Sequence, residues 1–237
     1  MPDTAIMLAA GLGKRMRPIT DTIPKPLVEV AGKPLIDWGL DALGDAGVQK
    51  TIVNVHYLAD KLEAHLSGCK APQIIISDER DCLLDSAGGI IKALPELGKE
   101  PFFVLNADTF WVGDAARPNL AALAEFWDDA RMDILLMTAE FSQATGFEGK
   151  GDFVAGDEGR LRRARDVAGT PVIYAGAGIL HPRIFAGAEP GVSSLNRYFD
   201  AAIAAGRLYA MPMSGHWLTV GTPEAIGEAE AALSALA

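Results

Sequence analysis

Strand-like and helical apolar patterns alternate along the first 140 residues of the chain. Short apolar runs, typical of strands buried on both faces, span residues 4–9, 50–55, 73–77, 101–106 and 133–138. Apolar residues at helical spacing predict helices over residues 34–43, 59–66, 90–97 and 120–130. Repeated strand–helix units of this kind predict a parallel sheet covered by helices on both faces.

The pattern changes after Glu140. Residues 146–159 are rich in glycine and charge, and short strand-like pieces follow near Phe153, near Leu161 and over 172–179. We expect this part to be an antiparallel or loop-rich insertion set against the main sheet. A final helix is predicted over 223–236. Because no linker, internal repeat or low-complexity segment interrupts the chain, we expect one α/β domain over residues 1–237.

Charge and composition exclude several classes of protein. The 237 residues include 21 Lys+Arg and 31 Asp+Glu, a formal net charge of −10, which disfavours general nucleic-acid binding. Two cysteines cannot form a disulfide framework, so we expect a reduced, cytoplasmic setting. The N-terminus lacks the cationic start of a signal peptide, and no apolar run approaches the ~20 residues of a membrane span. We therefore expect neither a membrane nor a nucleic-acid partner.

A glycine-rich segment, LAAGLGKRMRP over residues 8–18, directly follows the first predicted strand. Glycines after a parallel strand let the backbone approach a ligand and direct amide N–H groups at it. Five cations follow within a short distance: Lys14, Arg15, Arg17, Lys25 and Lys33. Such clustering in an acidic chain predicts a polyphosphate site. The simpler alternative is a glycine turn beside solvated charges.

Two better-known phosphate motifs match this segment less well. A dinucleotide-binding fingerprint needs a third small residue where Met16 stands, which disfavours an NAD(P)-binding domain. A P-loop needs Ser or Thr after Gly-Lys, whereas Pro34 follows Gly32-Lys33.

The segment LAAGLGKRMRP…IPKPLVEVAGKPLI resembles the signature of the sugar-1-phosphate nucleotidyltransferases. The resemblance implies a Rossmann-like, three-layer α/β/α nucleotide-diphospho-sugar transferase fold with a mostly parallel central sheet. It also implies a nucleotide-binding half over about 1–110, a sugar-binding half over about 111–222 and a closing helix. These enzymes transfer a nucleoside monophosphate from an NTP to a sugar 1-phosphate and release pyrophosphate. By resemblance, the nucleotide is bound by Ala10, Gly11, Gly13, Lys14 and Arg15. Arg15 would contact the leaving phosphates, and Lys25 would neutralise charge where the two substrates meet.

Two later segments resemble further parts of that signature. LDSAGGI, residues 84–90, is similar to the second nucleotide loop, which implies base contacts from Ser86, Ala87 and Gly88; an ordinary strand-to-helix turn is the alternative. Asp108, in Asn106-Ala107-Asp108, follows a predicted strand at the sheet edge where α/β proteins bind ligands. A carboxylate there suits Mg²⁺, and in the family this aspartate holds the catalytic metal.

The C-terminal segment departs from the family pattern at one position. Residues 217–223 read Trp-Leu-Thr-Val-Gly-Thr-Pro, whereas the family has a second metal-binding aspartate at the third place. Here that residue is Thr219, a poor Mg²⁺ ligand. Either His216, Glu224 or water would complete the metal shell, or the chain is a catalytically impaired nucleotide-sugar-binding protein.

The remaining motifs are most similar to the bacterial N-acetylmuramate-1-phosphate uridylyltransferases. These motifs are DSAGGI, Gly-Asp-Phe at 151–153 and YAGAGILHP at 174–182. The resemblance implies UTP and N-acetylmuramate α-1-phosphate as substrates, in cell-wall sugar recycling. It also implies a sugar pocket that includes Asn106, Glu140, Asp152 and Gly176. Mannose-1-phosphate guanylyltransferase, or the same reaction on another substrate pair, is the alternative. The oligomeric state is left open.

Overall fold

A mixed β-sheet forms the centre of the protein. The computed structural model describes residues 1–113 and 117–236. Four parallel neighbours lie in the order β5-β4-β1-β6. They are β1 (Thr4–Leu8), β4 (Lys50–Val55), β5 (Gln73–Asp78) and β6 (Phe102–Asn106). The four corresponding predicted strands are confirmed to within a residue or so at each end, and β8 (Ile134–Ala139) confirms the fifth.

The predicted insertion is wrong in one respect, because its longest strand belongs to the main sheet. β12 (Pro171–Leu180) lies between β6 and β8 and is antiparallel to both. β8 therefore runs in the direction of β6, and β13 (Leu208–Pro212) pairs parallel to β8. Only β10 (Phe153–Ala155) and β11 (Leu161–Arg163) form the expected antiparallel extension, beside the first residues of β12.

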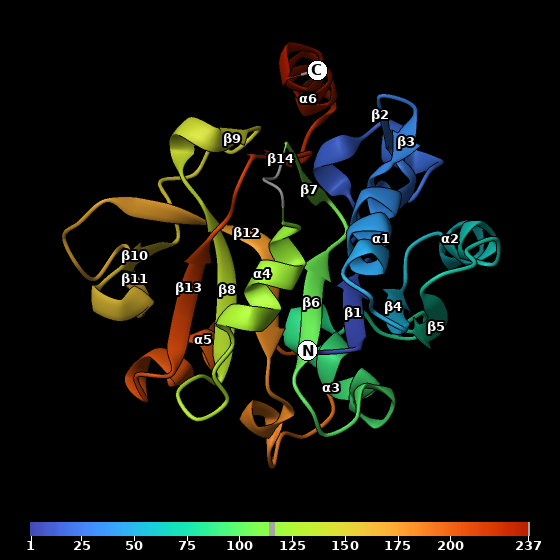
Figure 1. Ribbon diagram of the computed structural model, residues 1–237. Coiled ribbons are helices and arrows are strands. Elements are labelled where there is room, and N and C mark those ends of the chain that lie inside the picture. Colours follow the sequence, from blue (N-terminus) through green and yellow to red (C-terminus); the bar gives the residue numbers. More distant parts are fainter. Residues whose placement is uncertain (114–116, 237) are drawn as a thin grey trace.

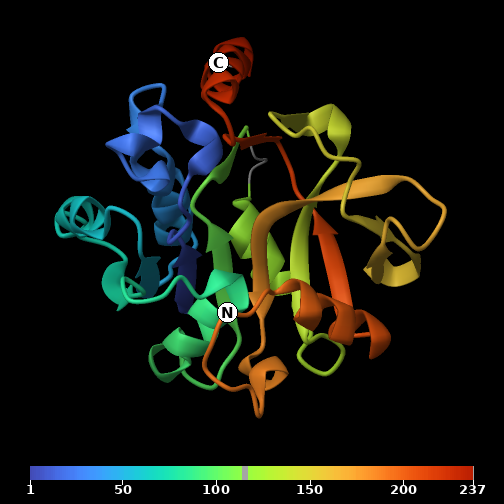
Figure 2. The same ribbon diagram turned by 180° about the vertical axis from the view of Figure 1, so that it is seen from behind.

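Helices cover both faces of the sheet (Figures 1 and 2). Alternation along β1 divides the core, because Ala5 and Met7 point to one face and Ile6 to the other. The first face packs against α1 (Leu35–Asp45), α2 (Ala59–Leu66) and α4 (Asn119–Phe126). The second packs against α3 (Asp85–Leu97) and α5 (Asn196–Ala204). This is the expected three-layer α/β/α fold. None of the described helices is long and apolar enough to cross a membrane.

A smaller sheet lies above the carboxyl edge of the main sheet (Figure 1). It contains β7 (Thr109–Val112), β14 (His216–Thr219) and β9 (Ala144–Thr145), in the order β7-β14-β9. The hairpin of β2 (Glu29–Val30) and β3 (Lys33–Pro34) and the helix α6 (Pro223–Leu236) complete this region. Met16, Phe110 and Leu218 are fully or almost fully buried together there, so the first and last motifs share one small core.

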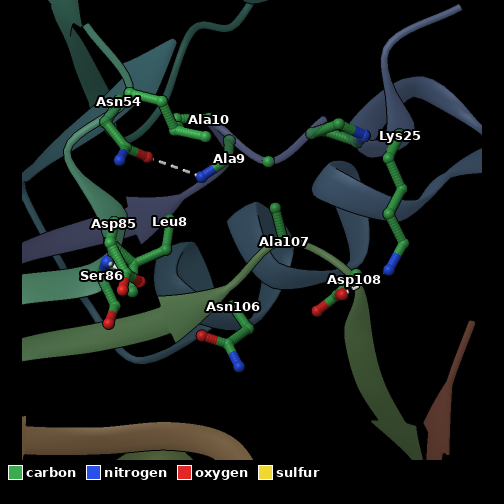
Figure 3. A pocket seen from close by; sticks show the side chains of 13 residues that line it. Leu8, Ala9, Ala10, Lys25, Asn54, Asp85, Ser86, Asn106, Ala107 and Asp108 are labelled. Atoms are coloured by element: carbon green, nitrogen blue, oxygen red, sulfur yellow. Dashed lines mark hydrogen bonds and ion pairs between the residues drawn. The ribbon is translucent and has the colours of Figure 1, made fainter. Parts of the chain in front are cut away.

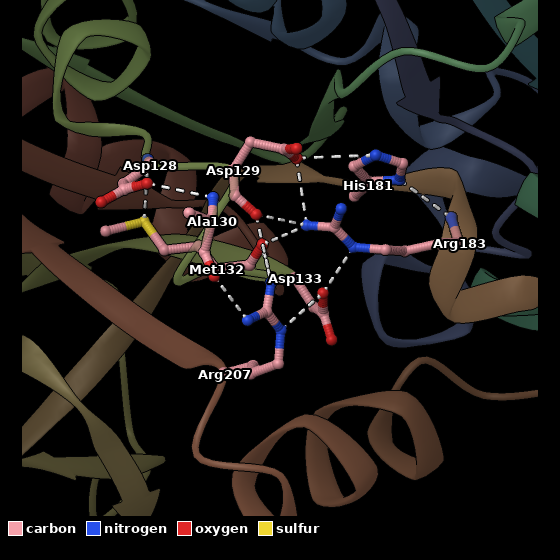
Figure 4. A network of polar contacts seen from close by, with 8 residues as sticks. All are labelled: Asp128, Asp129, Ala130, Met132, Asp133, His181, Arg183 and Arg207. Atoms are coloured by element: carbon pink, nitrogen blue, oxygen red, sulfur yellow. Dashed lines mark hydrogen bonds and ion pairs between the residues drawn. The ribbon is translucent and has the colours of Figure 1, made fainter.

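Asp133, at the opposite edge of the sheet, is the centre of a polar network (Figure 4). Its carboxylate accepts hydrogen bonds from Arg183 Nε at 2.7 Å and forms an ion pair with Arg207 Nε at 2.9 Å. Burial by itself would raise the pKa of Asp133, but the two guanidinium groups outweigh burial and lower it below the ordinary value. The network ties the start of β8 to the segments that follow β12 and precede β13.

Candidate active site

The main pocket lies at the carboxyl ends of β1, β4 and β6 and has a volume of about 360 Å³ (Figure 3). This edge of a parallel sheet is where open α/β folds bind their ligands. The pocket is lined by Leu8, Ala9, Ala10, Gly11, Lys25, Pro26, Asn54, Leu83, Asp85, Ser86, Asn106, Ala107 and Asp108. The structure thus brings together the glycine-rich segment, the DSAGG segment and the strand-end aspartate.

The glycine-rich segment turns sharply away from the sheet after β1. The Ala9 amide donates to Asn54 Oδ1 at 2.6 Å, which fixes the start of the turn. Ala10 and Gly11 form part of the pocket wall. Gly13 has φ +60°, and a Cβ there would lie 2.9 Å from Thr20 Cγ2, so this position requires glycine. Gly13 therefore shapes the turn, although it does not itself line the pocket.

Lys25 and Asp108 form an ion pair at the pocket, with Lys25 Nζ 2.5 Å from Asp108 Oδ2 (Figure 3). The Lys25 side chain is only 12% exposed, whereas Asp108 is 36% exposed. Lys25 lies on the short 3-10 helix Lys25–Leu27, and Asp108 lies between β6 and β7. The geometry therefore presents a cation and a carboxylate side by side at the position where the sequence predicts the two substrates to meet.

Arg15 connects the first motif to the last. Lys14 and Arg15 are exposed residues of the 3-10 helix Lys14–Met16 and are not among the residues that line the pocket. The Arg15 guanidinium packs over Gly221, where a Cβ would lie 3.4–3.5 Å from three guanidinium atoms. The Gly-Thr-Pro segment therefore provides a flat surface for Arg15 beside the pocket.

Thr219 lies next to Asp108 in space. It pairs with Thr109 across β14 and β7, and the Val220 amide donates to the Asp108 carbonyl at 3.1 Å. His216 points to the opposite face of β14, as alternation requires, and its Nε2 is 2.8 Å from the Thr145 hydroxyl. His216 is therefore not placed to replace the missing aspartate. In the described part of the chain, no cluster of three or more His, Cys, Asp or Glu side chains is suited to hold a metal ion.

The DSAGG segment is not a loop, because it forms the first turn of α3. Asp85 and Ser86 line the pocket, but the Ala87 and Gly88 amides donate to the Ser193 carbonyl at 2.8 and 2.9 Å. The expected helix start at residue 90 is thus corrected to Asp85. Ala87 and Gly88 are buried against the segment around Ser193 and do not line the pocket, and their contribution to base binding stays a prediction.

The residues expected to bind the sugar divide into two groups. Asn106 lines the pocket, and Gly176 lies beside it at φ +75°, where a Cβ would be 2.3 Å from Thr109 Oγ1. The register of β12 against β8 shifts at this point. Asp152 lies away from these residues along β12 and accepts the Tyr174 amide at 2.8 Å. Glu140 is exposed just after β8 and is not among the residues that line the pocket.

Seven of the residues that line the pocket were not predicted as site residues: Leu8, Ala9, Pro26, Asn54, Leu83, Asp85 and Ala107. Asn54 interrupts the apolar run TIVNV near its carboxyl end, a position that could have identified it. Asp85 has φ +61°, which is unusual for a residue with a side chain, and Pro26 lies next to Lys25. Neither Asp85 nor Pro26 has a pattern that distinguishes it from an ordinary turn residue.

Residues 4–162 match the family model described as nucleotidyl transferase, which is well over half of the chain. The chain belongs to this family. It is 44% identical over 98% of both chains to the N-acetylmuramate alpha-1-phosphate uridylyltransferase of Caulobacter vibrioides. It is 36% identical over 96% of both chains to the protein of the same name from Neisseria meningitidis serogroup B. It is also 31% identical to the mannose-1-phosphate guanylyltransferase catalytic subunit beta of Danio rerio, over 93% of this chain and 61% of that protein.

Solved structures share the fold of this nucleotidyl transferase. The inositol-1-phosphate CTP transferase from T. maritima superposes with a TM-score of 0.76 over 97% of this chain and 96% of that one, at 19% identity. A UDP-glucose pyrophosphorylase complexed with UDP-glucose also has a TM-score of 0.76, over 99% of both chains at 20% identity. These likenesses confirm the predicted fold class.

Proposed function

We propose that this nucleotidyl transferase is a uridylyltransferase that acts on N-acetylmuramate α-1-phosphate. The observation that carries the proposal is the pocket itself, in which the glycine-rich turn, Lys25 and Asp108 converge at the carboxyl edge of the sheet. The choice of base and sugar is supported by the 44% identity to the Caulobacter vibrioides enzyme over almost the whole chain.

The reaction would be an in-line displacement at phosphorus. A phosphate oxygen of the sugar 1-phosphate forms a bond to the α-phosphorus of UTP. The bond from that phosphorus to the oxygen bridging the α- and β-phosphates breaks, and pyrophosphate leaves with the bond electrons. Because the attacking oxygen is already an anion, no general base is required, and the chain's task is to position two anions that repel each other.

The cations of the site suit that task. Lys25 is held in a mostly buried position at the pocket, where a positive charge acts more strongly than in bulk water. We propose that Lys25 neutralises charge on the phosphates of the two substrates where they meet in the transition state. Arg15 does not line the pocket, but its guanidinium packs against Gly221 beside it. This position suits contact with the leaving pyrophosphate. Lys14 would add to the field that attracts the triphosphate.

Asp108 fits the binding of Mg²⁺. Mg²⁺ commonly takes one or two carboxylates together with water and substrate phosphate oxygens, and Asp108 offers a partly exposed carboxylate at the pocket. Thr219 has no carboxylate to add, so Asp108 would be the one acidic ligand from these two positions. When bound, the metal would supply charge neutralisation for the triphosphate. Lys25 and Asp108 would then separate to contact their own substrate groups.

The wall beyond Asp108 is the proposed sugar side. Asn106 and Gly176 lie together there, and the close approach of Gly176 to Thr109 leaves no room for a side chain. Asn106 would hydrogen-bond a sugar hydroxyl or the acetamido group. Asp152 and Glu140, which are outside the pocket lining, would contact the sugar only if the 140–153 segment moved toward it.

A pyrophosphate-release assay tests the proposal. UTP, CTP, GTP and dTTP would each be combined with N-acetylmuramate α-1-phosphate, glucose 1-phosphate and mannose 1-phosphate, with Mg²⁺ or with EDTA. We expect release with UTP and the muramate in Mg²⁺ alone. Release with GTP and mannose 1-phosphate would replace the substrate assignment. Nucleotide binding without release from any pair would contradict the proposed catalysis and favour a binding protein.

A further inference from the structure

Glu79 is an almost completely buried carboxylate at the base of the nucleotide pocket. It follows β5, is 1% exposed and is not one of the residues that line the pocket. Within residues 1–113 and 117–236 it forms no ion pair, and both of its carboxyl oxygens accept hydrogen bonds instead. Burying a carboxylate without a cation is costly unless its oxygens accept well-placed hydrogen bonds. The partners of its two oxygens therefore show which segments Glu79 connects.

Each oxygen of Glu79 accepts a hydrogen bond from a different segment of the pocket. Oε1 accepts from the Asn54 side-chain amide at 2.7 Å, and Oε2 accepts from the Leu84 backbone amide at 3.0 Å. Asn54 in turn accepts the Ala9 amide through Oδ1 at 2.6 Å (Figure 3). The chain of contacts therefore runs from the start of the glycine-rich turn, through Asn54 and Glu79, to the residue just before α3.

The second glycine of DSAGG accommodates this arrangement. A Cβ on Gly89 would lie 2.6 Å from Glu79 Oε1 and 2.7 Å from Asn54 Nδ2. Contacts this short do not occur, so a side chain at position 89 would push the carboxylate or the amide aside. The helix that carries Asp85 and Ser86 into the pocket thus packs directly over the Glu79–Asn54 pair.

We infer that Glu79 is a positioning residue for nucleotide binding, which sets the distance between the glycine-rich turn and the first turn of α3 through Asn54 and the Leu84 amide. The glycine-rich turn and the first turn of α3 form opposite parts of one pocket. The hydrogen bonds that connect them run from Ala9 through Asn54 and Glu79 to Leu84, and we call this chain the relay. The inference rests on the proposed function for the identity of the nucleotide, and on the geometry for the relay.

Exchange of the two polar groups provides a test, because donors and acceptors can be mismatched and then matched again. In Glu79→Gln, two N–H donors still point at a side chain that keeps only one acceptor oxygen. In Asn54→Asp, two carboxylates face each other. In the double variant, the new carboxylate at position 54 accepts from the Ala9 amide and from the new side-chain amide at position 79. The remaining oxygen at position 79 accepts from Leu84.

The measurements are the Kd for UTP by calorimetry, the KM values for UTP and the sugar phosphate, and the melting temperature. We expect each single variant to raise the Kd for UTP by about tenfold or more, the cost of one mismatched buried hydrogen bond. The double variant should return it to within about threefold of wild type, because the two sites are directly coupled. The KM for the sugar phosphate should stay within about twofold, since Asn106 is not part of the relay.

Leu208→Ala is the matched control for loss of stability. Leu208 is buried at the start of β13, at the opposite end of the sheet from the pocket, so its truncation lowers the melting temperature without touching the relay. We expect its Kd for UTP to be unchanged. An equal rise in Kd in this control would attribute the effect to general loosening and overturn the inference.

Other outcomes of these measurements would also support or overturn the relay. Single variants that bind UTP like wild type, or a folded double variant that binds it as weakly as the singles, would overturn the relay. If the singles do not fold, native affinity in the folded double variant supports it. The same pattern with CTP, GTP or dTTP in place of UTP would uphold the relay and refute the choice of nucleotide. Failure of the wild-type protein to bind any of the four would overturn both.

Discussion

Replacement of Gly89 by alanine sets two opposing effects against each other. Gly89 lies inside α3, where alanine is favoured over glycine by about 1 kcal/mol in intrinsic helix propensity. The added methyl group would, however, lie 2.6 Å from Glu79 Oε1 and 2.7 Å from Asn54 Nδ2. Both side chains are almost fully buried, and each is also held by a second hydrogen bond, Asn54 to the Ala9 amide and Glu79 to the Leu84 amide.

The cost of the short contacts with Glu79 and Asn54 outweighs the gain in helix propensity. Separating Glu79 from Asn54 leaves a buried acceptor and a buried donor unpaired, which costs about 1–3 kcal/mol for each group. After the propensity gain of about 1 kcal/mol, the free energy of unfolding should fall by about 1–5 kcal/mol. For a chain of this size, a loss of about 2 kcal/mol lowers the melting temperature by roughly 4–8 °C.

Gly227→Ala in α6 is the control, because the substitution is the same but the surroundings are open. No heavy atom lies within 4 Å of a Cβ built at position 227. Its melting temperature should rise by roughly 1–3 °C, from helix propensity alone. Both variants would be melted by circular dichroism in the same buffer at pH 7.

A rise in melting temperature for Gly89→Ala would refute the reasoning, since it would mean that the Glu79–Asn54 pair adapts at no cost. A fall in both variants would instead show that propensity is a poor guide in these helices. Opposite signs are the result that the packing requires.

Four further predictions follow from the site and the polar network. Lys25→Ala and Asp108→Ala should each lower kcat by at least about a hundredfold in the pyrophosphate assay while leaving the far-ultraviolet circular dichroism unchanged, because the charges act on the reacting phosphates. Gly221→Ala should leave the KM for UTP within about twofold of wild type, since its methyl group would lie in ordinary van der Waals contact with the Arg15 guanidinium at 3.4–3.5 Å; a severalfold rise would contradict the packing. Asp133→Asn should lower stability by about 1–3 kcal/mol at pH 7, measured by urea unfolding. Because the folded-state pKa of Asp133 is lowered, its contribution is complete above the ordinary carboxyl pKa and is lost as pH falls through the folded value. The difference between wild type and Asp133→Asn should therefore shrink below about pH 4, and a constant difference would contradict it.

Local pattern was sufficient for most of the first half of the chain. The strands β1, β4, β5, β6 and β8 are continuous apolar runs, so their type and bounds follow from local composition even though β1 pairs with β6 through residues as distant as Ala5 and Phe103. The same logic places their carboxyl ends on one edge, so the meeting of Ala10, Gly11 and Asp108 in one pocket could be predicted from order alone.

The second half depends on pairing between distant segments. The strand-like piece expected over 172–179 is β12, but its place between β6 and β8 was not predicted, because that place is set by partners as distant as Phe102 and Ala139 and includes a register shift. α5, β13 and β14 were not predicted, because their short runs gain stability only against elements formed elsewhere.

The sequence by itself determined the family, the succession of strands and helices in the first 140 residues and the charged groups around the pocket, because these depend on motifs and short-range periodicity. Only the tertiary structure decided how the motifs are held. It buries Glu79 between the glycine-rich turn and the first turn of α3, packs Arg15 against Gly221 and puts Thr219 beside Asp108. Each of these contacts joins residues that are distant in the chain, and no local pattern records which distant group will satisfy a buried acceptor or fill the space above a glycine.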